Sequence, residues 1–169
     1  MIPEPNAEGN LPAGVHEAEW PEIAARFGTT VTRRRLLSGL AEGLRLLMAA
    51  GCRRVWLDGS FVTASEVALG RGPRDFDACW DIAGVDLSRL ALSAEEFFEF
   101  RPGHPGQKRR WSGEFFPVGG PVPPGGIDQV EFFQTDRAGG AKGILLLSLD
   151  RALLHEPEEF LEGVAHDHE

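Results

Sequence analysis

Four residues in two short segments have the chemistry to handle a metal ion and a phosphate. Asp75 and Asp77 flank Phe76 in a stretch with strand-like alternation, and Gly59 and Ser60 follow a short apolar run. Residues two apart on a strand point to the same face, so the aspartates are predicted to project side by side. At about 6 Å and an effective dielectric of about 20, they repel each other by roughly 3 kcal/mol. A divalent cation removes this repulsion, and Mg²⁺ (or Mn²⁺) prefers carboxylate and phosphate oxygens.

The Gly59–Ser60 pair suits the phosphate side of such a site. Glycine lets the backbone approach a phosphate closely, and the Ser60 hydroxyl adds a donor. If the residues from Phe61 onward are helical, their amide groups contribute to an anion site. Asp58, just before the pair, is interpreted as a turn or cap residue. The order of the two segments therefore predicts phosphates lying opposite metal ligands.

Hydrophobic spacing predicts the helices that precede this site. A short helix is expected over residues 20–27. A longer one follows Thr30 or Thr32 as its N-cap and ends at Gly51. Its apolar stripe has three- and four-residue spacing and consists of Leu36, Leu37, Leu40, Leu44, Leu47 and Met48.

Gly39 and Gly43 lie inside this longer helix. Each costs about 1 kcal/mol relative to alanine in a helix interior. Their presence therefore suggests close packing of the helix against a neighbouring backbone.

The chemical segments themselves are assigned to strands. Residues 53–57 and 75–80 are expected to be strands, with a short helix over 61–69 between them. Residues 87–100 are weakly helical in pattern, and 101–126, rich in Gly, Pro and Arg, are expected to form a long ordered loop.

The last third of the chain is interpreted as a β-hairpin. Strands are expected over 127–134 and 142–149, around a turn at 135–140. Asp150 is expected to cap a last short helix, and residues 164–169 to form a flexible tail.

These elements predict an α+β (mixed α/β) fold with a small central mixed sheet flanked by helices. The 169 residues fit a single domain, residues 1–169, with an irregular lead-in over residues 1–19. Hydrophobic residues make up 42% of the chain and charged residues 25%, which is enough apolar material for a packed core.

Charge and composition exclude several classes of function. The net charge of −9 disfavours a general coating of nucleic acid. No apolar run approaches the roughly 20 residues that a membrane helix needs, and the N-terminus lacks the pattern of a secretory signal. Two cysteines, Cys52 and Cys79, are too few for a disulfide scaffold, so a cytoplasmic location is expected.

The pattern of the chemical segments resembles the nucleotidyltransferase superfamily. The shared core of that superfamily carries a hydrophobic strand, Gly-Ser at the start of a helix, and Asp-x-Asp on the next strand. Most of residues 9–147 are also similar to a sparsely characterised bacterial family with this core. The similar segments are residues 9–12, 14–17, 20, 26–28, 52–54, 58–63, 75–80, 132–134, 136–137 and 142–144.

The resemblance implies two-metal nucleotidyl transfer. Asp75 and Asp77 would hold a metal ion on the triphosphate of an NTP, ATP among the candidates. Together with a third carboxylate they would hold a second metal ion, which lowers the pKa of an acceptor hydroxyl. For that third carboxylate Glu131 aligns best with the superfamily pattern, and Asp128 is the second choice.

The resemblance also implies roles for residues that contact phosphate. The amides of Gly59 and Ser60 would hold the β- and γ-phosphates. Lys108, Arg109 or Arg110 would neutralise charge on the leaving pyrophosphate, although such a run is usually a solvated face.

Three functions are compared on this basis. The first is a transferase acting on an RNA, protein or small-molecule acceptor, by analogy a toxin whose partner is an antitoxin protein. The alternative is a catalytically inactive module that binds a nucleotide or a partner. The long gap from Ser60 to Asp75 and the presence of Arg74, where a small hydroxyl residue is common, favour this alternative. A metal-dependent nuclease ranks last, because no His-rich ligand set is evident.

Overall fold

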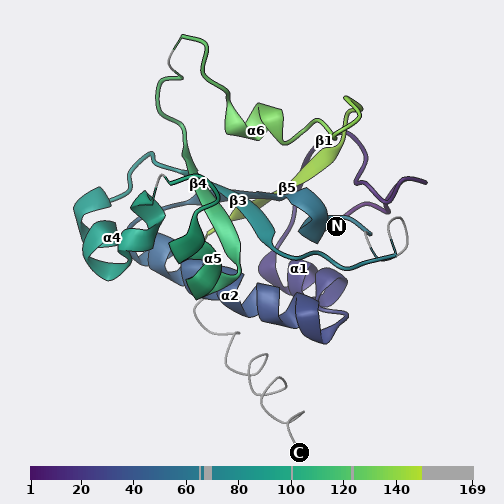
Figure 1. Cartoon of the computed structure of the whole chain (residues 1–169), viewed down its shortest axis with the longest axis horizontal. Helices are drawn as coiled ribbons and strands as arrows, with labels where there is room; N and C mark the ends of the chain where they lie inside the picture. Colours follow the sequence, from purple (N-terminus) through teal and green to yellow (C-terminus); the bar gives the residue numbers. More distant parts are fainter. Residues whose placement is uncertain (65, 67–69, 100, 123, 150–169) are drawn as a thin grey trace, which may run out of the picture.

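The computed structural model describes all residues except 65, 67–69, 100, 123 and 150–169. Its centre is a mixed sheet with strand order β1-β5-β2-β3-β4 (Figure 1). The outer pairs β1–β5 and β3–β4 are parallel, whereas β2 runs antiparallel to both β3 and β5. The strands are β1 (Gly14–Glu17), β2 (Arg54–Asp58), β3 (Phe76–Asp81), β4 (Gly113–Val118) and β5 (Gly143–Ser148). The predicted α+β class is confirmed.

Helices α1 (Trp20–Phe27) and α2 (Val31–Ala49) lie on one side of the sheet, and α6 (Gln129–Phe132) lies on the other (Figure 1). The other helices are the 3₁₀ turns η1 (Gly59–Val62) and η2 (Glu95–Phe98), with α4 (Leu87–Ser93) and α5 (Pro105–Trp111). Over the described part of the chain, no helix combines the length and hydrophobicity needed to cross a bilayer.

Helix α2 packs against the core with its apolar stripe, as the spacing of that stripe predicts. Thr30 caps it by accepting a hydrogen bond from the Arg33 amide at 3.2 Å. A Cβ at Gly39 would overlap the backbone of Trp111, and a Cβ at Gly43 would overlap the Phe115 ring. The predicted close approach to a neighbouring backbone is therefore present at Gly39, whereas Gly43 packs closely against a side chain instead.

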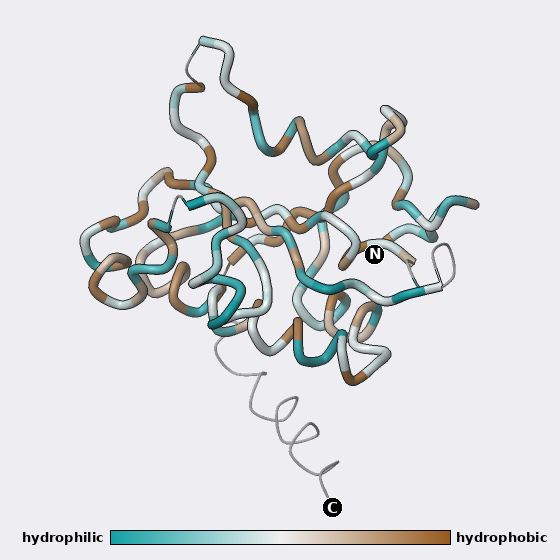
Figure 2. Tube along the Cα trace, viewed as in Figure 1, coloured by the Kyte–Doolittle hydropathy of each residue, from teal (hydrophilic) through white to brown (hydrophobic). Residues whose placement is uncertain are grey.

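The strands send alternate residues into the layer between the sheet and α2, which follows from their two-residue period. Figure 2 shows how hydrophobic and hydrophilic residues are distributed along the chain. The buried apolar strand residues that face this layer are Val55, Leu57, Phe76, Ala78, Trp80, Phe115, Leu145 and Leu147. The residues between them face the opposite side of the sheet, which we call the open face.

The strand expected over 127–134 is wrong, and so is the hairpin built on it. The segment contains α6, because the Asp128 side chain accepts a hydrogen bond from the Glu131 amide and starts a helical turn. A single bridge between Thr135 and Ala141 is what joins the flanks of the expected turn. Strand β5 pairs instead with β1 and β2, where its apolar side chains are buried.

Two expectations of irregular structure are also wrong. Residues 101–126, expected to be a loop, contain α5 and β4, and the lead-in 1–19 contains β1. Both β1 and β4 are edge strands, and β4 tolerates Pro117 for that reason. A short edge strand with one covered side contains too few alternating apolar and polar residues to be recognised from sequence.

The helix expected over 61–69 is represented by η1, whereas 65 and 67–69 lie outside the described residues. The helix expected after Asp150 and the tail 164–169 lie outside them as well.

Candidate functional site

Three carboxylates stand side by side on the open face. Asp58 ends β2 and is paired in register with Asp77 on the antiparallel strand β3. Asp77 is in turn paired with Glu114 on the parallel strand β4. Register partners project from the same face of a sheet. Asp58, Asp77 and Glu114 therefore form one row across three strands, which we call the acid row.

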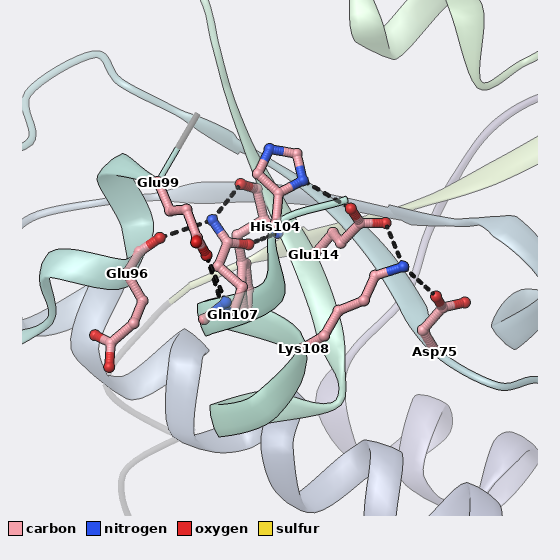
Figure 3. Close-up of polar contacts among 9 residues, drawn as sticks. Asp75, Glu96, Glu99, His104, Gln107, Lys108 and Glu114 are labelled. Carbon is pink, nitrogen blue, oxygen red and sulfur yellow. Dashed lines mark hydrogen bonds and ion pairs between the residues drawn. The ribbon is translucent and has the colours of Figure 1, made fainter. Parts of the chain in front are cut away.

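Asp75 joins the acid row from just before β3. The Nζ atom of Lys108, on α5, lies 2.9 Å from Asp75 Oδ2 and 3.4 Å from Glu114 Oε2 (Figure 3). The Asp75 charge also acts on Asp77, whose pKa it raises after the larger effect of burial. Asp75 and Asp77 thus converge on one corner of the open face, and Lys108 bridges that corner to β4.

Asp58 is the most deeply buried member of the acid row, with 2% of its surface exposed. Its Oδ1 atom lies 3.5 Å from Lys142 Nζ, and its Oδ2 atom has no hydrogen-bond partner among the described residues. Burial, and then the charge of Asp77, raise the pKa of Asp58 to about 8, against the opposing effect of Lys142. A buried oxygen without a partner costs free energy, so this position favours a proton or a bound cation.

Asp77 lies at the centre of these charges. Burial, then Asp75, then Glu114 raise its pKa to about 7, while Lys108 and Lys142 lower it. The fold therefore holds several acids together at a cost in free energy. Such an arrangement is typical of sites that bind a cation or perform catalysis.

The Gly59 bend lies directly against this cluster. Gly59 has a φ of +73°, and a Cβ added to it would overlap Asp77 Oδ2. The following turn is anchored by the buried Arg33 guanidinium, which donates to the carbonyl oxygens of Phe61 at 2.6 Å and Thr63 at 2.8 Å. Ser60, half-buried, begins that turn beside the acids.

Replacing Gly59 by alanine should lower the free energy of unfolding by about 2 kcal/mol and weaken Mn²⁺ binding at least about tenfold. Two effects cause these losses of stability and Mn²⁺ affinity. Alanine is strained in the left-handed backbone conformation, and its Cβ displaces the Asp77 side chain. Gly84→Ala is the matched control, because Gly84 has a φ of +77° with open space around its Cβ position. Urea denaturation and Mn²⁺ titration measure both quantities. Equal Mn²⁺ affinity in the two variants would show that the Gly59 contact has no part in the site.

Glu114 is held in place by partners from the segment that begins α5. Its Oε1 atom lies 2.7 Å from Nδ1 of His104, and its Oε2 atom contacts Lys108 (Figure 3). His104 has a left-handed backbone with φ 38°, and its ring packs edge-on against Phe116. A non-glycine residue in this conformation is strained, and such strain is concentrated at functional sites. Glu114 is not among the site residues predicted from sequence, because its strand was assigned to a loop.

Glu131 and Asp128, the sequence candidates for the third carboxylate, lie on and beside α6. Both are exposed, and Asp128 serves as the N-cap of that helix. The ring of Phe133, at the end of α6, packs against Phe116, which is the register partner of Cys79 on the open face, so α6 lies over that face. The structure nevertheless brings Glu114, and not Glu131, into register with Asp77.

The basic run at 108–110 is divided between two sides of α5. Lys108 reaches the acid row, whereas Arg110 pairs with Glu42 at 2.9 Å and Glu96 at 2.8 Å. Arg109 lines an open hollow with Glu96, Glu99 and neighbouring residues, and none of the acids of the site lines that hollow. Of the three, Lys108 is therefore the one placed to contact a ligand of the acid row.

The donor atoms of the site suit a hard divalent cation, because they are all carboxylate oxygens and one of them, Asp58 Oδ2, is buried with no hydrogen-bond partner among the described residues. Within the described ranges, no three His, Cys, Asp or Glu side chains already surround a common point. The ammonium groups of Lys108 and Lys142 lie among the acids instead. Asp75, Asp77 and Glu114 are the residues that would hold a cation once Lys108 withdraws.

The comparisons with known proteins identify a family but indicate no biochemical function. The model of a family of unknown function, DUF6932, matches residues 3–148. No curated protein matches the chain, and no solved structure does.

Proposed function

We propose that this chain, which belongs to the DUF6932 family of unknown function, is a metal-dependent nucleotidyltransferase. It would move a nucleoside monophosphate from an NTP to an RNA, protein or small-molecule acceptor. One observation carries the proposal: the Gly59 bend touches Asp77, which is the central member of an acid row joined by Asp75. A backbone bend suited to phosphate thus meets a cluster of carboxylates suited to a metal ion.

The residues present divide into a metal side and a phosphate side. Asp75, Asp77 and Glu114 would hold Mg²⁺ or Mn²⁺, which when bound supplies charge neutralisation and lowers the pKa of an acceptor hydroxyl. The Gly59 and Ser60 backbone would bind phosphate oxygens on the other side. These contacts fix the triphosphate in one orientation, which is the largest contribution that a protein makes to phosphoryl-type transfer.

The reaction that these residues would support needs only the NTP and the acceptor as reactants. The acceptor oxygen forms a bond to the α-phosphorus, the bond between that phosphorus and the β-phosphate oxygen breaks, and pyrophosphate leaves. The hydroxyl proton is released to solvent water. Lys108 lies close enough to the acids to neutralise the pyrophosphate as it forms.

The test is transfer of label from each α-³²P-labelled NTP in the presence of Mg²⁺ and total RNA or lysate. Wild type should label an acceptor and release pyrophosphate, and the double variant Asp75→Asn/Asp77→Asn should do neither. Arg109→Met, which changes a charge in a hollow that none of these acids lines, should behave as wild type. Equal labelling by wild type and the double variant would refute the proposal.

A second candidate is an inactive nucleotide-binding module on the same fold. It is favoured by the two lysines that already neutralise the acids and by the lack of a ready-made ligand set in the described segments. Mg²⁺-dependent NTP binding without any pyrophosphate release would select this candidate over the transferase.

A further inference from the structure

Both lysines of this chain contact the acid site. Of the 17 basic residues in the sequence, Lys108 and Lys142 are the two lysines. One contacts Asp75 and Glu114, and the other contacts Asp58. Arginine makes most of the other ion pairs in the described structure, for example those of Arg26, Arg54 and Arg110.

The two ammonium groups approach the acid row from opposite ends. Lys108 comes from α5, beside β4, and Lys142 immediately precedes β5, beside β2. The charges of both act on Asp77, which lies between them. Any ligand bound over Asp77 would therefore lie between two lysines.

Lys142 also lies beside the Gly59 bend. Strands β2 and β5 are antiparallel, and Leu57 is the register partner of Leu145. Residues that precede Leu145 therefore lie next to residues that follow Leu57, which are Asp58, Gly59 and Ser60. A phosphate held by the bend would be within reach of a Lys142 ammonium group that moved away from Asp58.

The contacts of these lysines leave binding capacity unused. An ammonium group has three donors, yet within the described residues Lys142 Nζ has one contact, at 3.5 Å, the outer limit of a hydrogen bond. Lys108 is 41% exposed, and Asp58 Oδ2 is buried with no hydrogen-bond partner in the part of the chain that the structure describes. A compact charge on a flexible stem exchanges partners more easily than a guanidinium held in a two-pronged pair.

Charge balance indicates when such an exchange would occur. Asp58, Asp75, Asp77 and Glu114, when ionised, are only half neutralised by two lysines, and the excess equals the charge of one divalent cation. A cation bound by Asp75, Asp77 and Glu114 would compete with Lys108 for the same oxygens, and its charge would repel the Lys142 ammonium group from the adjoining Asp58. The lysines would then be left, at the edge of the site, with unpaired positive charge.

We propose that Lys108 and Lys142 are exchangeable cations, which neutralise the acid row in the free protein and bind the β- and γ-phosphates of a nucleotide when a metal ion occupies the carboxylates. This inference rests on the proposed function and names the phosphate-binding residues of the same site. Lys142, which lies far from Lys108 in sequence, would thus bind the same ligand.

The scarcity of lysine makes the exchange directly measurable. The chain has three amines, those of Met1, Lys108 and Lys142, so an amine-acylating reagent followed by peptide mass spectrometry reads each separately. Relative to protein in EDTA, Mg²⁺ alone should increase the labelling of both lysines several-fold. Adding a non-hydrolysable NTP should reduce it again. The N-terminal amine, paired with Glu22, is the internal reference and should not respond.

Lysine variants provide a second test, because their affinity for the Mg²⁺–nucleotide complex should fall while their affinity for the metal ion alone should not. Lys108→Met and Lys142→Met should each weaken binding of the Mg²⁺–nucleotide complex about tenfold or more, the factor for one charge-assisted hydrogen bond. Each should bind Mn²⁺ alone as tightly as wild type, or more tightly, because a competing charge is gone. Arg109→Met is the matched control and should change neither affinity. Circular dichroism confirms that each variant is folded.

The outcomes separate this inference from the proposed function. If wild type binds the Mg²⁺–nucleotide complex while lysine labelling stays constant and both variants bind it normally, the lysine exchange is refuted and the proposed function stands. If calorimetry shows that wild type binds the non-hydrolysable analogue of none of the four NTPs, both are refuted. Labelling that rises with Mg²⁺ and falls with nucleotide supports both.

Discussion

Replacing Glu114 by glutamine should lower the rate of nucleotidyl transfer about 100-fold or more, since even residues that only support metal ligands contribute about 10- to 100-fold. Glutamine keeps the shape and the contact with His104 but removes the charge that faces Asp77 and Lys108. Mn²⁺ affinity should fall with the rate. Steady-state kinetics and Mn²⁺ titration measure the two effects.

Glu131→Gln is the matched control for this prediction. Both residues are glutamates that follow Asp77 in the chain, but Glu131 is exposed on α6 whereas Glu114 is in register with Asp77. Glu131→Gln should therefore leave rate and Mn²⁺ affinity at wild-type levels. The reverse result, with Glu131 essential and Glu114 dispensable, would mean that the functional site is built around α6.

Replacing Asp77 by asparagine should abolish transfer and at the same time stabilise the free protein at pH 8. The pKa of Asp77 is raised from 3.8 to about 7, so the folded protein binds this proton more tightly than the unfolded chain does. This carboxyl group therefore makes the protein less stable as the pH rises from about 4 to about 7, and the loss persists above that range. Asparagine avoids the charge, and we expect a gain on the order of 2 kcal/mol at pH 8.

The measurement is urea denaturation of wild type and Asp77→Asn in EDTA at about pH 6 and about pH 8.5, a window in which ordinary carboxylates stay ionised. The stability difference between the two proteins should be larger at the higher pH. Mg²⁺ should then stabilise wild type but not the variant, because a ligand stabilises only the state that binds it. A variant that is less stable than wild type at both pH values would contradict this account of Asp77.

Local sequence determined the elements whose pattern is long or regular. The apolar stripe and Thr30 predict α2, and the helix over 20–27 ends at the observed residues. The strand before Gly59 and the strand that carries Asp77 were expected at 53–57 and 75–80, and both lie one residue later. These predictions succeed because a helix stripe, a cap or a short buried strand is specified by residues close together in the chain.

The third member of the acid row depends on pairing between distant segments. Glu114 lies in a stretch rich in glycine, proline and arginine, where nothing local distinguishes a strand from a loop. Strand β4 forms there because Phe115 packs against Phe76 and Gly43 in the core, which fixes Glu114 on the open face beside Asp77. Glu131 was preferred by order in the chain, yet the Asp128 cap turns its segment into a helix.

By itself, then, the sequence determined the chemical identity of the site: a glycine bend, an Asp-x-Asp strand and an α+β framework. The tertiary structure decided which residues belong to the site, because it places Asp58, Glu114 and Lys142 beside Asp77. The physical reason is that the register of a strand is fixed by which side chains its partners bury. That information is spread over four strands and is contained in no single segment of the chain.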